Sequence, residues 1–114
     1  MVERYLAGAC QPHLPNPRDR DETASRVNHL LAMIDGAVIG YRPFGDVKLL
    51  VFPEFAHAAP VYFTAAELYD RLAIQIPNEH TDRYHRKARE HGVHIQTGTF
   101  LERDDRYPGH VFNT

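Results

Sequence analysis

Glu54 is the residue whose type and position point most directly to chemistry. It follows the segment 47–52, Val-Lys-Leu-Leu-Val-Phe, whose nearly continuous apolar character predicts a strand buried on both faces. Pro53 has no amide hydrogen to donate to a sheet, so it ends this strand and places Glu54 at the strand's C-terminal end. Open α/β folds bind their ligands at that edge. We therefore expect Glu54 to be partly desolvated and to act as a general base, the alternative being a solvated loop glutamate.

The loop after Glu54 supplies three further candidates, as substrate-binding residues. His57 follows the glutamate by three residues, and Tyr62 and Phe63 lie in the same irregular, proline-containing loop. His57 is expected either to contact the substrate or to be held by packing and hydrogen bonds within the loop. Tyr62 and Phe63 are expected either to shape an acyl pocket or to pack beneath the loop. Near the end of the sequence, Asn113 is expected to satisfy backbone groups.

Histidine and cysteine content raises the question of metal and thiol chemistry. The chain has eight histidines, and the spacings of six and three between His85, His91 and His94 do not place all three on one helix face. We expect surface or helix-cap histidines and no metal site; a small metal protein is the alternative, which elemental analysis would reveal. Cys10 is the single cysteine, and it is expected to be a small buried thiol because no activating partner is visible.

The elements that must position Glu54 alternate between strands and helices. In chain order they are a strand at 5–10, a helix at 24–38, the strand at 47–52, a short helix at 64–72, a helix at 81–91, and strands at 93–102 and 110–114. The first helix is predicted from apolar residues that recur every three or four positions. Thr64 offers a helix cap and Gly92 a helix stop. This order predicts an α/β fold with a partly parallel sheet and a closing hairpin.

Length and charge limit the class of protein. The 114 residues suit one domain, 1–114, and the formal net charge of −2, with no basic stripe, argues against nucleic-acid and membrane partners. The absence of a signal-like apolar run and the single cysteine favour a cytoplasmic location. Because the sequence stops within an expected strand at Thr114, we expect the N-terminal half of an incomplete domain.

Several segments of the chain together carry a resemblance to a known family. They are the helix stripe at 24–38, the motif Leu50-Val51-Phe52-Pro53-Glu54, the segment Phe63-Thr64-Ala65-Ala66-Glu67-Leu68, the helix at 84–92 leading into the strand at 93–98, and the ending Phe112-Asn113-Thr114. In this order, along almost the whole chain, they resemble the nitrilase family of carbon–nitrogen hydrolases, including its amidase and carbamoylase branches. The resemblance implies the N-terminal part of that family's α-β-β-α sandwich.

The resemblance also implies a mechanism. A Glu-Lys-Cys triad would hydrolyse a small-molecule amide, N-carbamoyl compound or nitrile through a covalent thioester, with no metal or other cofactor. Only the glutamate maps onto this chain, as the general base Glu54, and the lysine and cysteine would follow Thr114. Lys48 and Lys87 do not match the motif of the family's lysine. This span alone is therefore expected to be inactive, and the parent enzyme to be a homo-oligomer by analogy.

A different class of function stays open at this stage. A non-catalytic module would keep this front part of the fold and bind a partner chain through its open edge. The two hypotheses differ in one observation, which is whether the reading frame continues past Thr114 with a lysine and then a cysteine on further strands.

Overall fold

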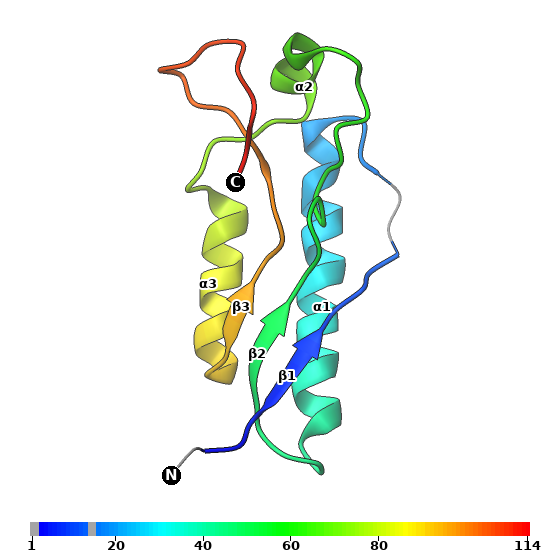
Figure 1. Cartoon of the computed structure of the whole chain (residues 1–114), viewed down its shortest axis with the longest axis vertical. Coiled ribbons are helices and arrows are strands. Elements are labelled where there is room, and N and C mark those ends of the chain that lie inside the picture. Colours follow the sequence, from blue (N-terminus) through cyan, green and yellow to red (C-terminus); the bar gives the residue numbers. More distant parts are fainter. Residues whose placement is uncertain (1–2, 14–15) are drawn as a thin grey trace.

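The computed structural model describes residues 3–13 and 16–114, whose elements alternate largely as the sequence predicts (Figure 1). In chain order they are β1 (Leu6–Ala9), the 3-10 helix η1 (Arg20–Glu22), α1 (Thr23–Tyr41), β2 (Val47–Val51), α2 (Ala65–Arg71), α3 (Glu79–His91), β3 (His94–Gln96), β4 (Leu101–Glu102) and β5 (Phe112–Asn113). β1, β2 and β3 form one parallel sheet with β2 in the centre, and β4 pairs antiparallel with β5. The predicted α/β class and the closing hairpin are both confirmed.

Helix α1 builds most of the core. Its apolar stripe is buried, with Val27, Leu30 and Ile34 at zero exposure, and it packs against Leu50 of the central strand. A helix with such a stripe is stabilised mainly by the apolar face that it buries. Among the helices of the described chain, none combines the length and the hydropathy needed to cross a membrane.

Helix α3 begins at Glu79, earlier than predicted, because Asn78 caps it. The Asn78 side chain accepts hydrogen bonds from the backbone amides of His80 and Thr81 at 2.7 and 3.0 Å. The Thr81 hydroxyl in turn accepts from the Asn78 amide at 2.9 Å, which completes a capping box. The helix ends as predicted at Gly92, whose φ of 63° lies in the left-handed region.

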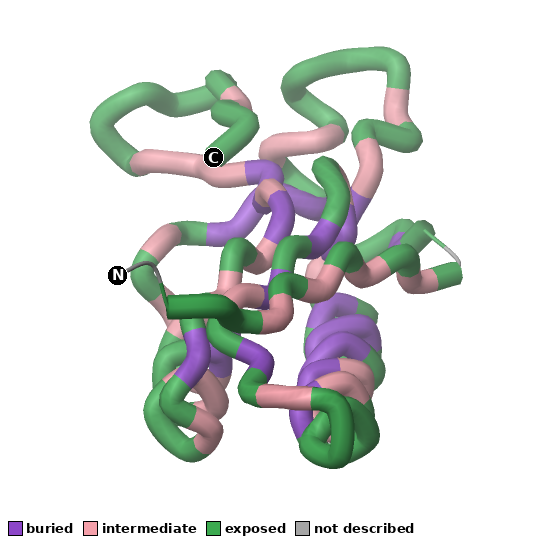
Figure 2. The backbone as a smooth tube through the Cα atoms, turned by 60° about the horizontal axis from the view of Figure 1, so that its bottom comes forward, coloured by how far each residue is buried: buried purple, intermediate pink, exposed green. Residues whose placement is uncertain are grey.

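The parallel sheet is covered on one face only, which corrects the prediction of a strand buried on both faces. Leu50 and Phe52 face α1 and α3 and are 0% and 2% exposed, whereas Val51 on the opposite face is 39% exposed. The cross-strand partners of Val51, which are Ala9 and Gln96, are exposed as well. Figure 2 shows the buried segments gathered between the two long helices and the strands. In the described chain, no helix lies on the second face, so the apolar run of β2 is not enclosed there.

The predicted strand at 93–102 is divided in two. β3 ends at Gln96, and β4 begins only at Leu101. Between them Gly98 has a φ of 80°, and a Cβ atom at this position would lie 2.2 Å from the carbonyl oxygen of Pro53. The chain therefore leaves the parallel sheet here because it passes directly against the turn that follows β2.

Gly98→Ala should destabilise the protein by more than about 3 kcal/mol, because the new methyl group would collide with backbone and the left-handed φ would be strained. Gly109→Ala is the matched control, since its φ is 77° and a Cβ there would meet nothing within 4 Å. The control should lose only about 1 kcal/mol. Urea unfolding of both variants measures the two free energies, and equal losses would show that the contact with Pro53 is unimportant.

Candidate active site

Glu54 lies in the turn directly after the central strand, as the sequence predicts. Strand pairing continues just beyond β2, where the Phe52 amide donates to the Gln96 carbonyl at 2.9 Å. Pro53 then ends the ladder, and Phe55 adopts a left-handed φ of 56°. The side chain of Glu54 therefore stands at the C-terminal edge of a parallel sheet, where α/β folds bind their ligands.

The segment that follows β3 fixes the turn around Glu54. The Phe55 amide donates to the Thr99 hydroxyl at 2.9 Å, and Gly98 packs against the Pro53 carbonyl. A left-handed φ at a bulky residue such as Phe55 costs free energy, and it persists only where surrounding contacts hold it. The Thr99 hydrogen bond and the Gly98 contact supply that restraint on either side of the glutamate.

Asn113 holds the carboxylate itself. Its side-chain amide donates to Oε1 of Glu54 at 2.6 Å, across 59 residues of sequence. Asn113 lies in β5 opposite Leu101 of β4, and the neighbouring Thr114 exchanges two backbone hydrogen bonds with Phe100 at 2.7 and 3.0 Å. Asn113 is therefore not confined to the backbone-satisfying role expected from sequence, because the hairpin register brings its amide to the glutamate.

Glu54 is exposed in the structure, contrary to the expected partial desolvation. The physical reason is the open face of the sheet beside it, where Val51 is also exposed. The carboxylate is thus oriented by a hydrogen bond, but the described part of the chain does not enclose it.

His57 is completely buried, and both of its ring nitrogens are engaged. Nε2 lies 2.8 Å from the Tyr84 hydroxyl, and Nδ1 lies 3.2 Å from the Thr99 carbonyl oxygen. Because a carbonyl can only accept, we assign the ring proton to Nδ1, and Tyr84 then donates to Nε2. The ring also stacks on Phe100, with 3.6 Å between centroids and 11° between planes.

Burial governs the protonation of this pair. Desolvation lowers the pKa of His57 to about 4 and raises the pKa of Tyr84, so both groups are neutral near pH 7. A neutral, hydrogen-bonded imidazole of this kind packs the loop against α3. This corresponds to the alternative in which packing and hydrogen bonds hold His57 within the loop. Contact between His57 and a substrate stays a prediction.

Tyr62 and Phe63 take different positions in the loop. The Tyr62 hydroxyl donates to the Arg18 carbonyl at 2.7 Å, and the Arg71 guanidinium lies 4.7 Å from the centre of its ring. Phe63 exposes its whole side chain. Within residues 3–13 and 16–114, no hydrogen bond or ring contact joins either of them to Glu54, and their role in substrate binding stays a prediction.

Comparison with known protein families identifies the family of this chain. The family model for carbon-nitrogen hydrolases matches residues 6–114. The chain belongs to the carbon–nitrogen hydrolase family. No significant match to an individual curated protein was found. The family match supports carbon–nitrogen bond hydrolysis in general, and the matched residues include both Glu54 and Asn113.

Within the described residues, no side-chain hydrogen bond or ion pair joins Glu54 to either lysine or to the cysteine of this chain. Lys48 lies 3.9 Å from Asp46 at the N-terminal end of β2, six residues before Glu54, which is roughly 20 Å along an extended strand. Lys87 contacts acidic side chains between the two long helices. Cys10 is partly buried against the core, and this burial raises the pKa of its thiol, which disfavours the reactive thiolate.

One cluster of possible metal ligands lies between α1 and α3. Ligand atoms of Asp35, Glu90 and His91 lie within 4.8 Å of one another. However, the ammonium group of Lys87 lies 2.9 Å from Asp35 and 3.0 Å from Glu90, and His91 lies 2.6 Å from Asp35. Burial opposes ionisation of Asp35, but hydrogen bonds from His91 and Lys87 outweigh it and lower the pKa of the carboxyl. The cluster is therefore an ion-pair network that joins the helices.

Two residues that hold Glu54 and its turn carried only weak sequence signals. Thr99, which holds the turn through its hydroxyl, follows Gly98 in a segment rich in β-branched residues, and that glycine was the available sign of a break. Asn113 is a residue type that is depleted in strands, so its place in β5 indicated a special role. Neither signal specifies the partner, because each contact joins segments far apart in the chain.

The free energy of unfolding should fall as the pH drops from about 6.5 to about 4. His57 has its pKa lowered from 6.5 to about 4 by folding, so the unfolded chain binds the extra proton in this window. The stabilisation is complete above pH 6.5, and its loss amounts to roughly 3 kcal/mol at pH 4. Urea unfolding at several pH values measures the slope.

His57→Gln should remove most of that pH dependence while retaining a polar group beside Tyr84. Some slope should remain, because burial also lowers the pKa of His80. His85→Gln, at an exposed position, serves as the control and should behave as the unmodified protein. An unchanged slope in His57→Gln would show that another group causes the pH dependence.

Proposed function

We propose that this chain supplies the general base, Glu54, of an enzyme that hydrolyses the carbon–nitrogen bond of a small amide, N-carbamoyl compound or nitrile. The observation that carries the proposal is the position of Glu54 at the C-terminal end of the central parallel strand, in a chain that belongs to a family of carbon–nitrogen hydrolases. The motif around Glu54, Leu50-Val51-Phe52-Pro53-Glu54, favours the nitrilase-like or amidase-like branch of this family. Enzymes of that branch would use a Glu-Lys-Cys triad.

In the proposed reaction with an amide, Glu54 accepts the proton of a cysteine thiol as the sulfur attacks the carbonyl carbon. The protonated carboxyl then gives that proton to the departing amine, and a thioester is left on the enzyme. Glu54 next takes a proton from water as the water oxygen attacks the thioester, and it returns that proton to the departing sulfur, so that the acid and the free thiol are released. A lysine stabilises the negative oxygen of both tetrahedral intermediates. The cysteine and lysine are proposed to lie outside this span.

The contact with Asn113 fits the requirements of such a base. A carboxylate on a flexible glutamate side chain must be held in one orientation to accept a proton efficiently. Donation from Asn113 to Oε1 restrains the group and leaves Oε2 to face the reacting atoms. We propose that Asn113 is a positioning residue for the general base, and that the enzyme is a homo-oligomer as its family resemblance implies.

Glu54→Gln should lower kcat of the full-length protein at least about 100-fold, because glutamine cannot accept the proton. Turnover is measured against a panel of small amides, N-carbamoyl compounds and nitriles. Glu3→Gln, at an exposed position before β1, is the control and should keep full activity. Full turnover by Glu54→Gln would remove this residue from the mechanism. Absence of turnover by the unmodified protein on every substrate would favour a non-catalytic binding module.

Asn113→Ala should lower kcat about tenfold and change KM little, because it removes an orienting contact without touching the remainder of the pocket. The thermal unfolding midpoint should change by no more than a few degrees, since Asn113 is exposed. Asn113→Asp has the same size but places a second negative charge beside Glu54, so its loss of kcat should be at least as large. Equal activity in all three proteins would show that the contact does not serve catalysis.

A further inference from the structure

A cavity lies between the start of α1, the start of α3 and the segment after β4, and Glu54 is not among its lining residues. Its volume is about 470 Å³, within the range of pockets that hold small molecules. Three separate segments contribute its charged and polar wall, which includes Arg20, Asp21, Asn78, Glu79, His80 and Arg103. These segments are the turn before α1, the first turn of α3 and the residue after β4.

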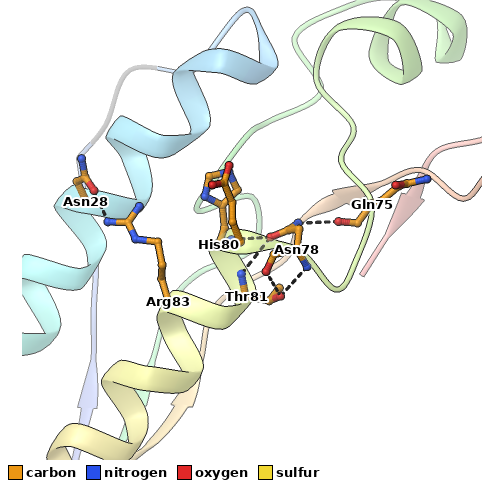
Figure 3. A network of polar contacts seen from close by, with 7 residues as sticks. Asn28, Gln75, Asn78, His80, Thr81 and Arg83 are labelled. Carbon is orange, nitrogen blue, oxygen red and sulfur yellow. Dashed lines mark hydrogen bonds and ion pairs between the residues drawn. The ribbon is translucent and has the colours of Figure 1, made fainter.

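The imidazole of His80 forms part of this wall and has an unused polar atom. The side chain is 9% exposed, and its Nδ1 is buried with no hydrogen-bond partner among the described residues. Nε2 lies 3.9 Å from Glu79, too far for a hydrogen bond. Figure 3 shows how Asn78 and Thr81 fix the backbone beneath the ring. A buried nitrogen in this state costs free energy unless a ligand or water satisfies it.

Arg103 provides a second unused donor in the same wall. Its Nε is buried and has no hydrogen-bond partner in the described part of the chain. The guanidinium lies 5.6 Å from the centre of the Tyr69 ring, a cation–π contact that restrains its plane. A restrained guanidinium with a free Nε is suited to bind a planar oxyanion through its donor fork.

Arg20 adds a fixed positive charge to the cavity. Its Nε donates to the Ala73 carbonyl at 2.9 Å, and its Nη2 donates to the carbonyls of Tyr69 and Asp70 at 3.0 and 3.1 Å. Burial and the nearby charge of Arg103 together lower the pKa of Arg20. Two like charges held close to one cavity repel each other, and an anion bound beside them would relieve that repulsion.

We propose that this cavity binds a small oxyanion, a carboxylate or a phosphate group, through donors on Arg103 and His80 and the positive charge of Arg20. Both nitrogens are enclosed by protein atoms, so binding requires the side chains of the cavity wall to shift and open a path to Nδ1 of the neutral imidazole and Nε of Arg103. Asp21 and Glu79 are exposed, and they limit the total negative charge that the site accepts. A singly charged carboxylate therefore suits the cavity better than a phosphate dianion.

The test is a titration of the ¹⁵N-labelled full-length protein with sodium acetate and, separately, with inorganic phosphate, at constant ionic strength kept with sodium chloride. Saturable shifts of the Arg103 Nε signal and of the His80 Nδ1 signal are expected for at least one of the two anions. Binding of acetate alone or of both anions supports the proposal, and binding of phosphate alone supports an oxyanion site while contradicting the expected preference for single charge. Shifts that grow linearly with concentration, or that chloride alone reproduces, would overturn it.

Matched arginine variants separate this cavity from general surface charge. Arg103→Gln should raise the Kd for the bound anion at least tenfold. Arg86→Gln removes the same charge from an exposed position of α3 outside the cavity and should leave the Kd unchanged. Equal weakening in both variants would overturn the proposal. If Arg103→Gln does not fold, two other measurements decide the question. They are the chemical-shift titration of the unmodified protein and the Kd of a His80→Gln variant, which should be at least tenfold higher than that of the unmodified protein.

Discussion

The buried imidazole of His57 is the interaction on which the arrangement around Glu54 depends. It joins three segments that are distant in sequence, which are its own loop, Tyr84 of α3 and the Thr99–Phe100 stretch that leads into β4. A fully buried imidazole is tolerated only when both nitrogens have partners and the ring is neutral, and both conditions are met here. Because Thr99 also accepts from Phe55, the same stretch sets the turn that carries the glutamate.

The two faces of the central sheet serve different purposes. The face with Leu50 and Phe52 is packed by helices and gives the sheet its stability, whereas the face with Val51 is open. Glu54 follows the central strand at the C-terminal edge of the sheet, next to the open face, and its side chain is exposed to solvent. A rigid packed side thus supports the proposed general base, whose immediate surroundings are not closed by the described elements, as a carboxylate that is to meet a substrate requires.

Local patterns in the sequence predicted the order of elements well. The apolar period of residues 24–38, the Thr64 cap and the Gly92 stop act within a few residues, so they can be recognised without knowledge of the fold. The cap at Asn78, a local feature, starts α3 two residues before the predicted position, and the larger misses involve segments that are far apart in the chain. The strand at 93–102 is broken at Gly98 by the carbonyl of Pro53, and Asn113 meets Glu54 only because the hairpin register directs it there. The open face of β2 was missed because its apolar residues do not reveal what covers them.

The hydrogen bond between Glu54 and Asn113 closes a span of 59 residues, whereas the parallel sheet is built largely from strands joined through their intervening helices. Transient release of the short β4–β5 ribbon would therefore free the carboxylate while the sheet and its helices stay protected from amide hydrogen exchange. In the proposed enzyme, the alignment of Glu54 therefore depends on a short two-stranded ribbon, and it can vary independently of the stability of the parallel sheet.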